Sequence, residues 1–427
     1  MRDILVTLLV IGGLPAILFQ PYIGVLMWSW IGYMNPHRLS WGFAVDFPFA
    51  QIIAIVTLVA LLFSREPKRI PWTRETIVLS LFILWMLVTT FFALSSELAW
   101  LQMEKVAKIQ LMTYVTMMLM YTRHRLNMLV WVIVFSLGFF GVKGGVFTIL
   151  SGGGERVLGP RGTFIEGNNE IGLALIMLIP LMRYLQLQVV KRWHWWLLTV
   201  SMFLTAVAVL GTHSRGALIG LAAMSLFMLF KSRKKMLVMV VLAIMVPIGL
   251  SVMPQSWFDR MKTIQTYEED ESMQGRFDAW RFAYETALQR PAVGGGYFVF
   301  YGKTDAHSIY FEVLGEHGFV GLFLFLLLML LTWRSGTWVR IKTADEPEMR
   351  WANDLTSMLQ VSMIGYAVSG AGLGLAYFDF YYHLIALMVL TRVIVTRQLA
   401  EKEGKSPADT VPLGTGTAIP SPASPGS

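Results

Sequence analysis

One histidine stands out among the residues that could carry out chemistry. His307 follows a long polar stretch and leads into a strongly apolar one. Imidazole is the side chain best suited to accept a proton near neutral pH, and at such a junction it can face both water and lipid headgroups. We therefore predict that His307 is a general base and that Ser308 beside it contacts substrate. If a helix already includes His307, Gly318 lies on the same face, and Gly318 with Gly321 allows close helix packing.

Three arginines are candidate partners for a negatively charged group. Arg161, Arg215 and Arg276 each lie next to a glycine, outside the apolar stretches. A guanidinium is permanently charged, and its forked geometry matches phosphate oxygens. Several guanidiniums converging at one membrane face would form a catalytic site for a lipid-linked pyrophosphate. The alternatives are structural roles for Arg161 and Arg215, and a surface ion pair between Arg276 and Asp278 or the acidic run 268–271.

Further polar residues on the same side are candidate substrate contacts: Lys143, Asn168, His213 and His317. Lys143 lies near the outer third of an otherwise apolar stretch, where it could also extend to the interface. His317 lies off the face of His307, which favours a structural or supporting role. Asp46, a lone acid in the first outer loop, is an alternative catalytic base.

The acidic run Glu268-Glu-Asp-Glu271 is the segment closest in type to a metal site. Consecutive acids on a loop are typical of a solvated surface, and no adjacent histidine completes a ligand set. The chain also contains no cysteine, so thiolate ligands and disulfides are excluded. No glycine-rich nucleotide-binding loop is apparent. We therefore expect neither a metal nor a cofactor.

The composition indicates what kind of elements must position these residues. Of the 427 residues, 55% are hydrophobic and only 15% are charged, whereas soluble domains carry roughly a quarter charged residues. The 26 Met, 15 Trp and 13% aromatic residues suit lipid contact and an interfacial belt. A net charge of +8 is best interpreted as a topology signal and an attraction for anionic lipid or phosphate, rather than for nucleic acid. The sequence predicts an all-α polytopic membrane protein.

A series of apolar stretches is long enough, or nearly so, to span a membrane. They lie at about residues 4–19, 22–34, 48–63, 76–94, 106–121, 127–150, 169–187, 195–211, 216–230, 236–253, 319–333, 355–375 and 378–396. Basic clusters occupy every second loop from residue 64 onward, which marks those loops as cytoplasmic. This regularity predicts about 12 net crossings with both termini cytoplasmic. Gln20-Pro21 then breaks the first two stretches into a single net crossing.

The remaining segments complete the predicted organisation. Residues 254–307 form a large, mostly polar periplasmic loop, with a helix-like stretch at 275–288 and a glycine-rich turn at 294–296. Residues 1–400 constitute the membrane domain. The tail 401–427 is rich in Pro, Gly, Ser and Thr towards its end, which is typical of a disordered cytoplasmic extension.

At His307 the chain resembles the O-antigen ligase family, whose members carry a WaaL/Wzy-type ligase domain. The family pattern is His, then Asn, Ser or Gln, nine residues, and Gly-x-x-Gly, which His307-Ser308 and Gly318-Phe-Val-Gly321 match in full. Ser214-Arg-Gly216 and the segment around Arg276 and Trp280 resemble two further family patterns. The N-terminal third is more similar to a subgroup described as O-glycosylation ligases.

The resemblance implies a fold like that of the multi-helix membrane glycosyltransferases and a site in the bacterial inner membrane. It implies transfer of a glycan from undecaprenyl pyrophosphate to a hydroxyl of lipid A core at the periplasmic face. The reaction would be metal-independent and inverting. By position, His307 would be the general base, and Arg161, Arg215 and Arg276 would bind the pyrophosphate.

Three alternatives remain open from the sequence. A polymerase of the same superfamily would join two lipid-linked repeats, and a protein O-oligosaccharyltransferase would use a protein hydroxyl as acceptor. A lipid-linked glycan transporter would show internal repeats and charges near the bilayer midplane. The charges here gather instead at one face, which disfavours transport.

Overall fold

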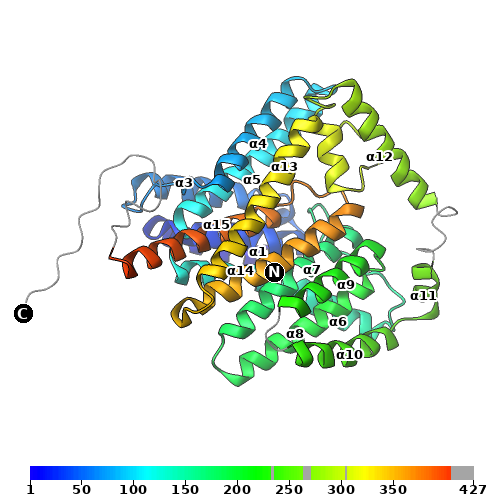
Figure 1. Cartoon of the computed structure of the whole chain (residues 1–427). Coiled ribbons are helices and arrows are strands. Elements are labelled where there is room, and N and C mark those ends of the chain that lie inside the picture. Colours follow the sequence, from blue (N-terminus) through cyan, green and yellow to red (C-terminus); the bar gives the residue numbers. More distant parts are fainter. Residues whose placement is uncertain (232–234, 263–270, 303–304, 405–427) are drawn as a thin grey trace, which may run out of the picture.

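In the computed structural model, which describes residues 1–231, 235–262, 271–302 and 305–404, the regular structure of the described chain is helical (Figure 1). The helices are α1 (Arg2–Phe19), α2 (Pro21–Met34), η1 (Pro36–Leu39), η2 (Phe43–Val45), α3 (Phe49–Phe63), α4 (Arg74–Phe91), α5 (Ser96–Leu119), α6 (Arg123–Leu150), α7 (Asn168–Gln188), α8 (Arg192–Gly211), α9 (Arg215–Lys231), α10 (Lys235–Ser251), α11 (Gln255–Lys262), α12 (Glu271–Gln289), α13 (Ile309–Lys342), η4 (Pro347–Met349), α14 (Arg350–Ser369), η5 (Gly370–Gly372) and α15 (Asp379–Lys402).

Every apolar stretch predicted from the sequence coincides with one of these helices. Seven of the described helices are long and apolar enough to cross a membrane: α1, α4, α6, α7, α8, α13 and α15. Helix α3 is apolar but shorter. The all-helical membrane architecture is therefore confirmed, whereas the number of crossings stays a prediction.

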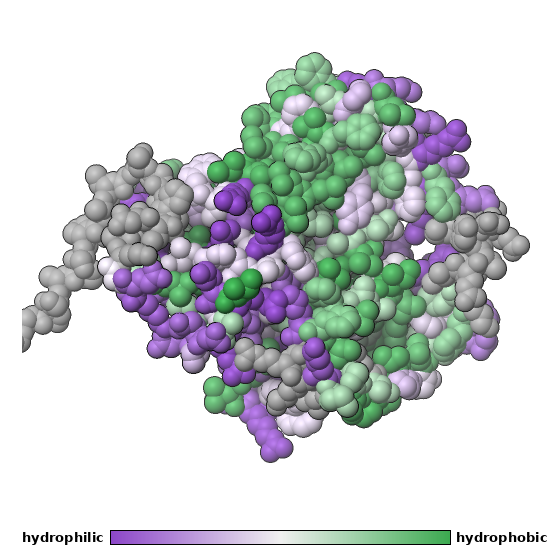
Figure 2. Space-filling view, in the orientation of Figure 1, coloured by the Kyte–Doolittle hydropathy of each residue, from purple (hydrophilic) through white to green (hydrophobic). Residues whose placement is uncertain are grey.

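The surface of the helices agrees with this architecture. On the face shown in Figure 2, hydrophobic side chains cover α4 and α13 and the region around α9. Hydrophilic side chains gather near the C-terminal end of α15 and along α12. A soluble protein would not expose so many large apolar side chains, because each exposed patch costs free energy in water.

Helices α7 and α15 are the most buried of the apolar helices named above. Helix α7 packs against α6, α8, α9 and α14, and α15 packs against α5, α13 and α14. The rings of Tyr366 on α14 and Tyr381 on α15 stack with centroids 4.3 Å apart, and both side chains are fully buried. This packing fixes the helix ends at which the candidate active site lies.

The first two helices, α1 and α2, pack against each other. Helix α1 ends at Phe19 and α2 begins at Pro21, as the proline predicts. However, Arg2 Nη1 donates to the Leu39 carbonyl at 3.2 Å, and Asp3 Oδ1 accepts the Gly42 N–H at 3.0 Å. The two helices therefore form a hairpin, because the first residues lie beside the segment that follows α2. How many net crossings these two helices make stays a prediction.

The two ends of the described chain consequently lie at opposite ends of the helices. Tyr33 near the end of α2 contacts His383 near the start of α15, with Tyr33 Oη 2.8 Å from His383 Nδ1. From there α15 runs away from the N-terminus to Lys402, whose Nζ binds Glu346 Oε2 at 2.7 Å in the α13–α14 connection. On which side of the membrane each terminus lies stays a prediction.

The predicted large loop is partly helical. It contains α11 and α12, and α12, which covers the predicted stretch 275–288, packs against α13. The rings of Trp280 and Phe311 stack at 5.1 Å, and Trp280 Nε1 donates to the Ala306 carbonyl at 3.0 Å. The predicted acidic run, apart from Glu271, and the tail from residue 405 lie outside the described residues.

Candidate active site

The structure places His307 two residues before α13. Its φ of 47° lies in the left-handed region, and the helix begins only at Ile309. The helical face that the sequence predicted for His307 and Gly318 therefore does not exist. The His307 side chain is 36% exposed, and its Nδ1 lies 3.5 Å from Asp305 Oδ2.

Burial, more than the surrounding charges, favours the neutral form of His307. Burial lowers the pKa of His307, the Asp305 carboxylate raises it, and the Arg276 guanidinium lowers it, so that the pKa ends below its ordinary value. A neutral imidazole retains a lone pair that can accept a proton. The site therefore keeps this base active at neutral pH and somewhat below.

Arg276 reaches the same place from α12. A Cβ added at Gly372 would lie 3.5 Å from Arg276 Nη1, so the guanidinium lies against η5. Its positive charge also acts on His307, whose pKa it lowers. A guanidinium and a base thus border one short loop.

This loop, residues 370–378, connects α14 to α15 and organises the site. A Cβ at Gly370 would lie 2.8 Å from Ile309 Cδ1, and one at Gly374 would lie 3.1 Å from Asp305 Oδ1. The Ala376 N–H donates to Glu312 Oε2 at 2.9 Å. The glycines let the loop approach the start of α13 closely, and Asp305 is held between them and His307.

The start of α9 borders the same loop. Arg215 is the first residue of α9, and Ser214 Oγ accepts the Ala217 N–H at 3.1 Å. A Cβ at Gly216 would lie 3.8 Å from the Ser369 carbonyl oxygen, and α9 packs against η5. The backbone of Arg215, the guanidinium of Arg276 and the imidazole of His307 are thus brought to residues 369–374.

His213 and Asn168 hold the segment that leads into Arg215. His213 is buried with φ 56°, and its Nε2 donates to the Gly153 carbonyl at 2.9 Å. Asn168 Nδ2 donates to the Thr212 carbonyl at 2.9 Å. Through these bonds both residues hold the backbone that leads into α9, and their contact with substrate stays a prediction.

Arg161 lies apart from this group. It is exposed on a turn in which the Gly162 N–H donates to Glu166 Oε2 at 2.8 Å. The turn reaches the far end of loop 370–378, where the rings of Phe164 and Phe378 have centroids 6.3 Å apart. No described contact joins Arg161 to His307.

Two other predicted substrate contacts also lie elsewhere. Lys143 is exposed on α6 and lines a cavity with Arg2 and Leu39. His317 is fully buried, with Nδ1 2.7 Å from Thr89 Oγ1 and its carbonyl accepting from Trp85 Nε1 at 3.0 Å. The absence of exposed surface favours the structural alternative for His317 over a substrate contact.

The remaining predicted residue, Ser308, and the alternative base, Asp46, have clear positions. Ser308 is buried beside His307, and its Oγ has no hydrogen-bond partner among the described residues. Asp46 pairs with Arg38 at 3.3 Å, and its side chain is 90% exposed. That ion pair and exposure give Asp46 the character of a surface carboxylate.

The sequence analysis missed two carboxylates on α13. Glu312 binds loop 370–378 as described above, and Glu316 Oε1 accepts the Phe298 N–H at 3.0 Å. Glu316 Oε2 also accepts the Tyr377 hydroxyl at 2.6 Å. Their four-residue spacing at the start of an apolar helix was the available signal, because it places both acids on one helix face.

Gly318 introduces a kink in α13, and the glycine-rich turn 294–296 packs against this kink. Its φ of 67° and ψ of −170° interrupt α13. A Cβ there would lie 2.4 Å from the Ala292 carbonyl oxygen, and the N–H groups of Gly295 and Gly296 donate to the carbonyls of Gly315 and Glu316 at 2.8 Å. The glycine that the sequence predicted for close packing therefore packs against the segment before α13.

Comparisons with known proteins give two family matches. Residues 200–326 match the O-antigen ligase family, and residues 1–190 match a family of unknown function, DUF5935. No curated protein matches the chain. The O-antigen ligase match includes Arg215, Arg276 and His307, and it confirms the family resemblance seen in the sequence.

Proposed function

We propose that this chain, which carries an O-antigen ligase domain at residues 200–326, is a membrane glycosyltransferase. It transfers a glycan from undecaprenyl pyrophosphate to a hydroxyl of lipid A core at the periplasmic face of the bacterial inner membrane. The observation that carries this proposal is the convergence of His307, Arg276 and the start of α9 on loop 370–378.

His307 acts as the general base in this reaction. Asp305 faces Nδ1 at 3.5 Å, so the tautomer with its proton on Nδ1 leaves the lone pair on Nε2. Nε2 accepts the proton of the acceptor hydroxyl, and that oxygen attacks the anomeric carbon of the glycan. The bond from the anomeric carbon to the pyrophosphate oxygen breaks, and the electron pair leaves with the pyrophosphate. Attack from the opposite side inverts the anomeric carbon.

Arg276 and Arg215 stabilise the pyrophosphate as it leaves. Their charges need no proton transfer, and a preorganised donor of this kind contributes about 10²–10³-fold to a rate. A positioned base contributes about 10²–10⁴-fold. These two effects suit a reaction that uses a preactivated lipid donor and needs no metal.

The proposed orientation follows from the basic clusters. They place the α3–α4, α5–α6 and α13–α14 connections in the cytoplasm, so the site at the other end of these helices faces the periplasm. The chain then crosses the membrane about 12 times or once more, depending on the N-terminal hairpin.

Reconstitution with defined substrates tests the proposal. The purified full-length chain in lipid nanodiscs receives undecaprenyl pyrophosphate-linked glycan and lipid A core, and the products are analysed by mass. We expect glycan covalently attached to lipid A core in the wild-type reaction and its loss in His307→Ala. His194→Ala, which changes a histidine among tryptophans at the start of α8, is the matched control and should retain transfer.

Other products would replace this assignment. Longer lipid-linked chains made from donor alone would indicate a polymerase. Attachment only to added protein would indicate an O-oligosaccharyltransferase. Donor that changes sides of the membrane with no covalent product would indicate a transporter.

A further inference from the structure

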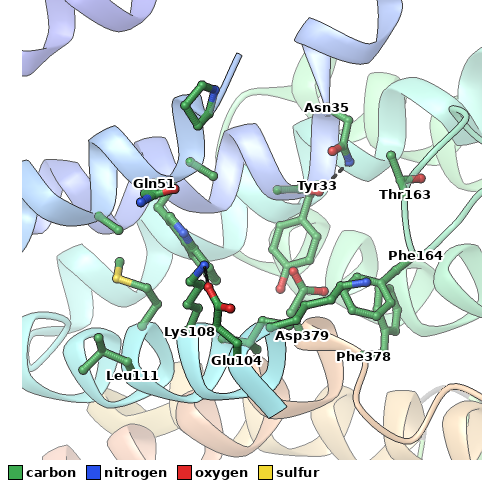
Figure 3. Close-up of a pocket in the computed structure, with 18 of the residues that line it drawn as sticks. Tyr33, Asn35, Gln51, Glu104, Lys108, Leu111, Thr163, Phe164, Phe378 and Asp379 are labelled. Atoms are coloured by element: carbon green, nitrogen blue, oxygen red, sulfur yellow. Dashed lines mark hydrogen bonds and ion pairs between the residues drawn. The ribbon is translucent and has the colours of Figure 1, made fainter. Parts of the chain in front are cut away.

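A groove of about 850 Å³ lies between α2, α3 and α5, next to the candidate active site (Figure 3). The turn at 162–165, the start of α15, Phe298 and Phe378 complete its lining. Most of the lining residues lie within the segment that matches the family of unknown function. Neither the proposed reaction nor that match assigns a role to this groove.

The groove is polar at one end and apolar at the other. Asn35, Thr163 and Asp379 lie at the outer end, where α2 ends and α15 begins. Helices α3 and α5 run inward from that end and contribute Leu58 and Leu111 at greater depth. Figure 3 shows Asp379 pointing towards Tyr33, with Leu111 on the far side of Glu104 and Lys108. An amphiphile with its headgroup outside and its chain inside fits this gradient.

Charged residues on α5 line the groove at membrane depth. Lys108 Nζ pairs with Glu104 Oε1 at 2.5 Å. Lys105 Nζ lies 3.8 Å from the centroid of the Phe164 ring and interacts electrostatically with the buried Asp379 carboxylate. Charges at this depth are costly and usually mark a binding path. Lys105 makes no described ion pair, so its ammonium is available to a phosphate.

A second cation borders the same mouth. Arg161 precedes the lining residue Gly162 and stands three residues before Phe164, over which Lys105 lies. It is exposed and makes no ion pair among the described residues. Lys105, which interacts with Asp379, and the exposed Arg161 thus lie beside an apolar groove, and their positive charges complement a lipid that carries a phosphate.

The groove and the proposed active site share loop 370–378. Asp305 and Arg276 contact the loop at Gly374 and Gly372, whereas the groove contacts it at Phe378. Four residues span at most about 14 Å, which limits the separation between Gly374 beside Asp305 and Phe378 in the groove. The pyrophosphate of the donor is assigned to Arg215 and Arg276, which leaves the groove for the second substrate.

We propose that this groove binds a phosphate-bearing lipid by its hydrocarbon chain, and that this lipid is the acceptor of the transfer. The identification of this lipid as the acceptor rests on the proposed function. It specifies the acceptor class: a membrane lipid with at least one phosphate near its headgroup, held by Lys105, and not a protein.

Photo-crosslinking of the full-length chain in phosphatidylcholine nanodiscs tests the binding. The probes are phosphatidic acid and diacylglycerol with the same diazirine on one acyl chain, so that they differ only in the phosphate. We expect the phosphatidic acid probe to label peptides from α3 and α5. Ala54→Trp fills the groove and should lower this labelling about tenfold, while Val200→Trp, on an exposed position of α8, should leave it unchanged.

Lys105→Ala tests the headgroup contact. It should lower labelling by phosphatidic acid about tenfold, the effect of losing one charge-assisted contact, and leave labelling by diacylglycerol unchanged. Lys342→Ala, at the other end of the helices, is the control for loss of a positive charge. If Ala54→Trp fails to insert, Ile55→Trp, on a groove residue that is 51% exposed, replaces it.

Two results would overturn the inference. Labelling of α3 and α5 that is equal in wild type and in both groove-filling variants would show that the groove holds no lipid. Loss of the phosphatidic acid label when undecaprenyl pyrophosphate is added would show that the groove holds the donor chain instead.

A transfer assay separates this inference from the proposed function. With glycerol as a soluble acceptor, Ala54→Trp should still consume the lipid-linked donor, whereas with lipid A core it should form no product. His307→Ala should fail with both acceptors. If the wild-type chain transfers no glycan at all, the proposed function fails, and the labelling result still decides whether the groove binds a phosphate-bearing lipid.

Discussion

The reactivity of His307 depends on three neighbours that come from different parts of the fold. Asp305 precedes it in the chain, Arg276 arrives from α12, and the loop glycines allow both to approach. The carboxylate fixes the tautomer, while burial and the guanidinium keep the imidazole neutral. The histidine is therefore prepared to accept a proton before any substrate arrives.

The pH dependence of glycan transfer should show the lowered pKa of His307. Only neutral His307 accepts a proton, so kcat/KM falls as pH drops through its pKa. Because burial and Arg276 lower this pKa, the acid limb should have its midpoint below the ordinary value of 6.5. A pH profile of the reconstituted reaction measures the midpoint. A midpoint of the acid limb above pH 6.5 would contradict the role of burial and Arg276 at His307.

Asp305→Asn should move that limb in a defined direction. The Asp305 carboxylate raises the pKa of His307, so its removal should shift the acid limb to lower pH. The kcat should also fall, because Nδ1–H is no longer held by a charge. Asp46→Asn, which changes an exposed carboxylate paired with Arg38, should alter neither quantity. An unshifted limb in Asp305→Asn would assign Asp305 a merely structural role.

Arg276→Lys should separate the effect of the positive charge from the effect of the forked guanidinium geometry. A lysine retains the positive charge but loses the forked pair of donors. We expect kcat to fall about 10-fold to 100-fold, and Arg276→Ala to lower it further, by about 10²–10³-fold. Arg281→Ala, which removes an exposed guanidinium one and a half turns away on α12, should retain activity.

At the scale of elements, glycines allow loop 370–378 and the segment before α13 to approach α13 closely. Loop 370–378 approaches α13 through Gly370 and Gly374, and the segment before α13 meets its kink at Gly318. A Cβ at Gly370 or Gly318 would come closer than Cβ atoms do, and one at Gly374 would make a tight contact. The half-buried Glu312 and the buried Glu316 then tie both segments to α13 through backbone and tyrosine donors.

Gly318→Ala should destabilise the protein by more than its backbone conformation alone requires. A non-glycine residue in the left-handed region costs about 1–2 kcal/mol, and the clash with the Ala292 carbonyl adds to this cost. Gly302→Ala is the matched control, because Gly302 has φ 75° but open space around it. Thermal unfolding of both purified variants in detergent should show the larger loss for Gly318→Ala. Equal losses would mean that the close contact contributes nothing.

At the scale of the molecule, the N-terminal hairpin gives the helices an order that agrees with the alternation of basic loops from residue 64 onward. The alternation failed only at the start when the N-terminus was placed in the cytoplasm. With α1 and α2 as a hairpin, Arg2 lies at the same end as residues 39–44. Each following helix then leads to the side that its basic residues indicate.

Cysteine labelling should test this orientation directly, since the chain contains no cysteine. In intact spheroplasts, a membrane-impermeant maleimide should label Trp41→Cys and Arg2→Cys, because both positions lie at the outer end. Glu348→Cys, in the α13–α14 connection, should react only after permeabilisation. Labelling of Trp41→Cys but not Arg2→Cys in intact cells would restore the single net crossing.

The sequence by itself determined the membrane architecture, because the apolar stretches that must leave water are local features of the chain. It also determined the junction at His307 and the break at Gln20-Pro21, since a histidine motif and a proline act over a few residues. It could not determine which candidates meet. Arg276, Asp305 and Gly372 are far apart in the chain, and only the packing of α12, α14 and α15 around α13 brings them together. The same packing buried His317, turned His213 and Asn168 towards backbone carbonyls, and opened the groove beside α5, because contacts over long sequence separations are decided by how helices pack and not by the pattern of any one of them.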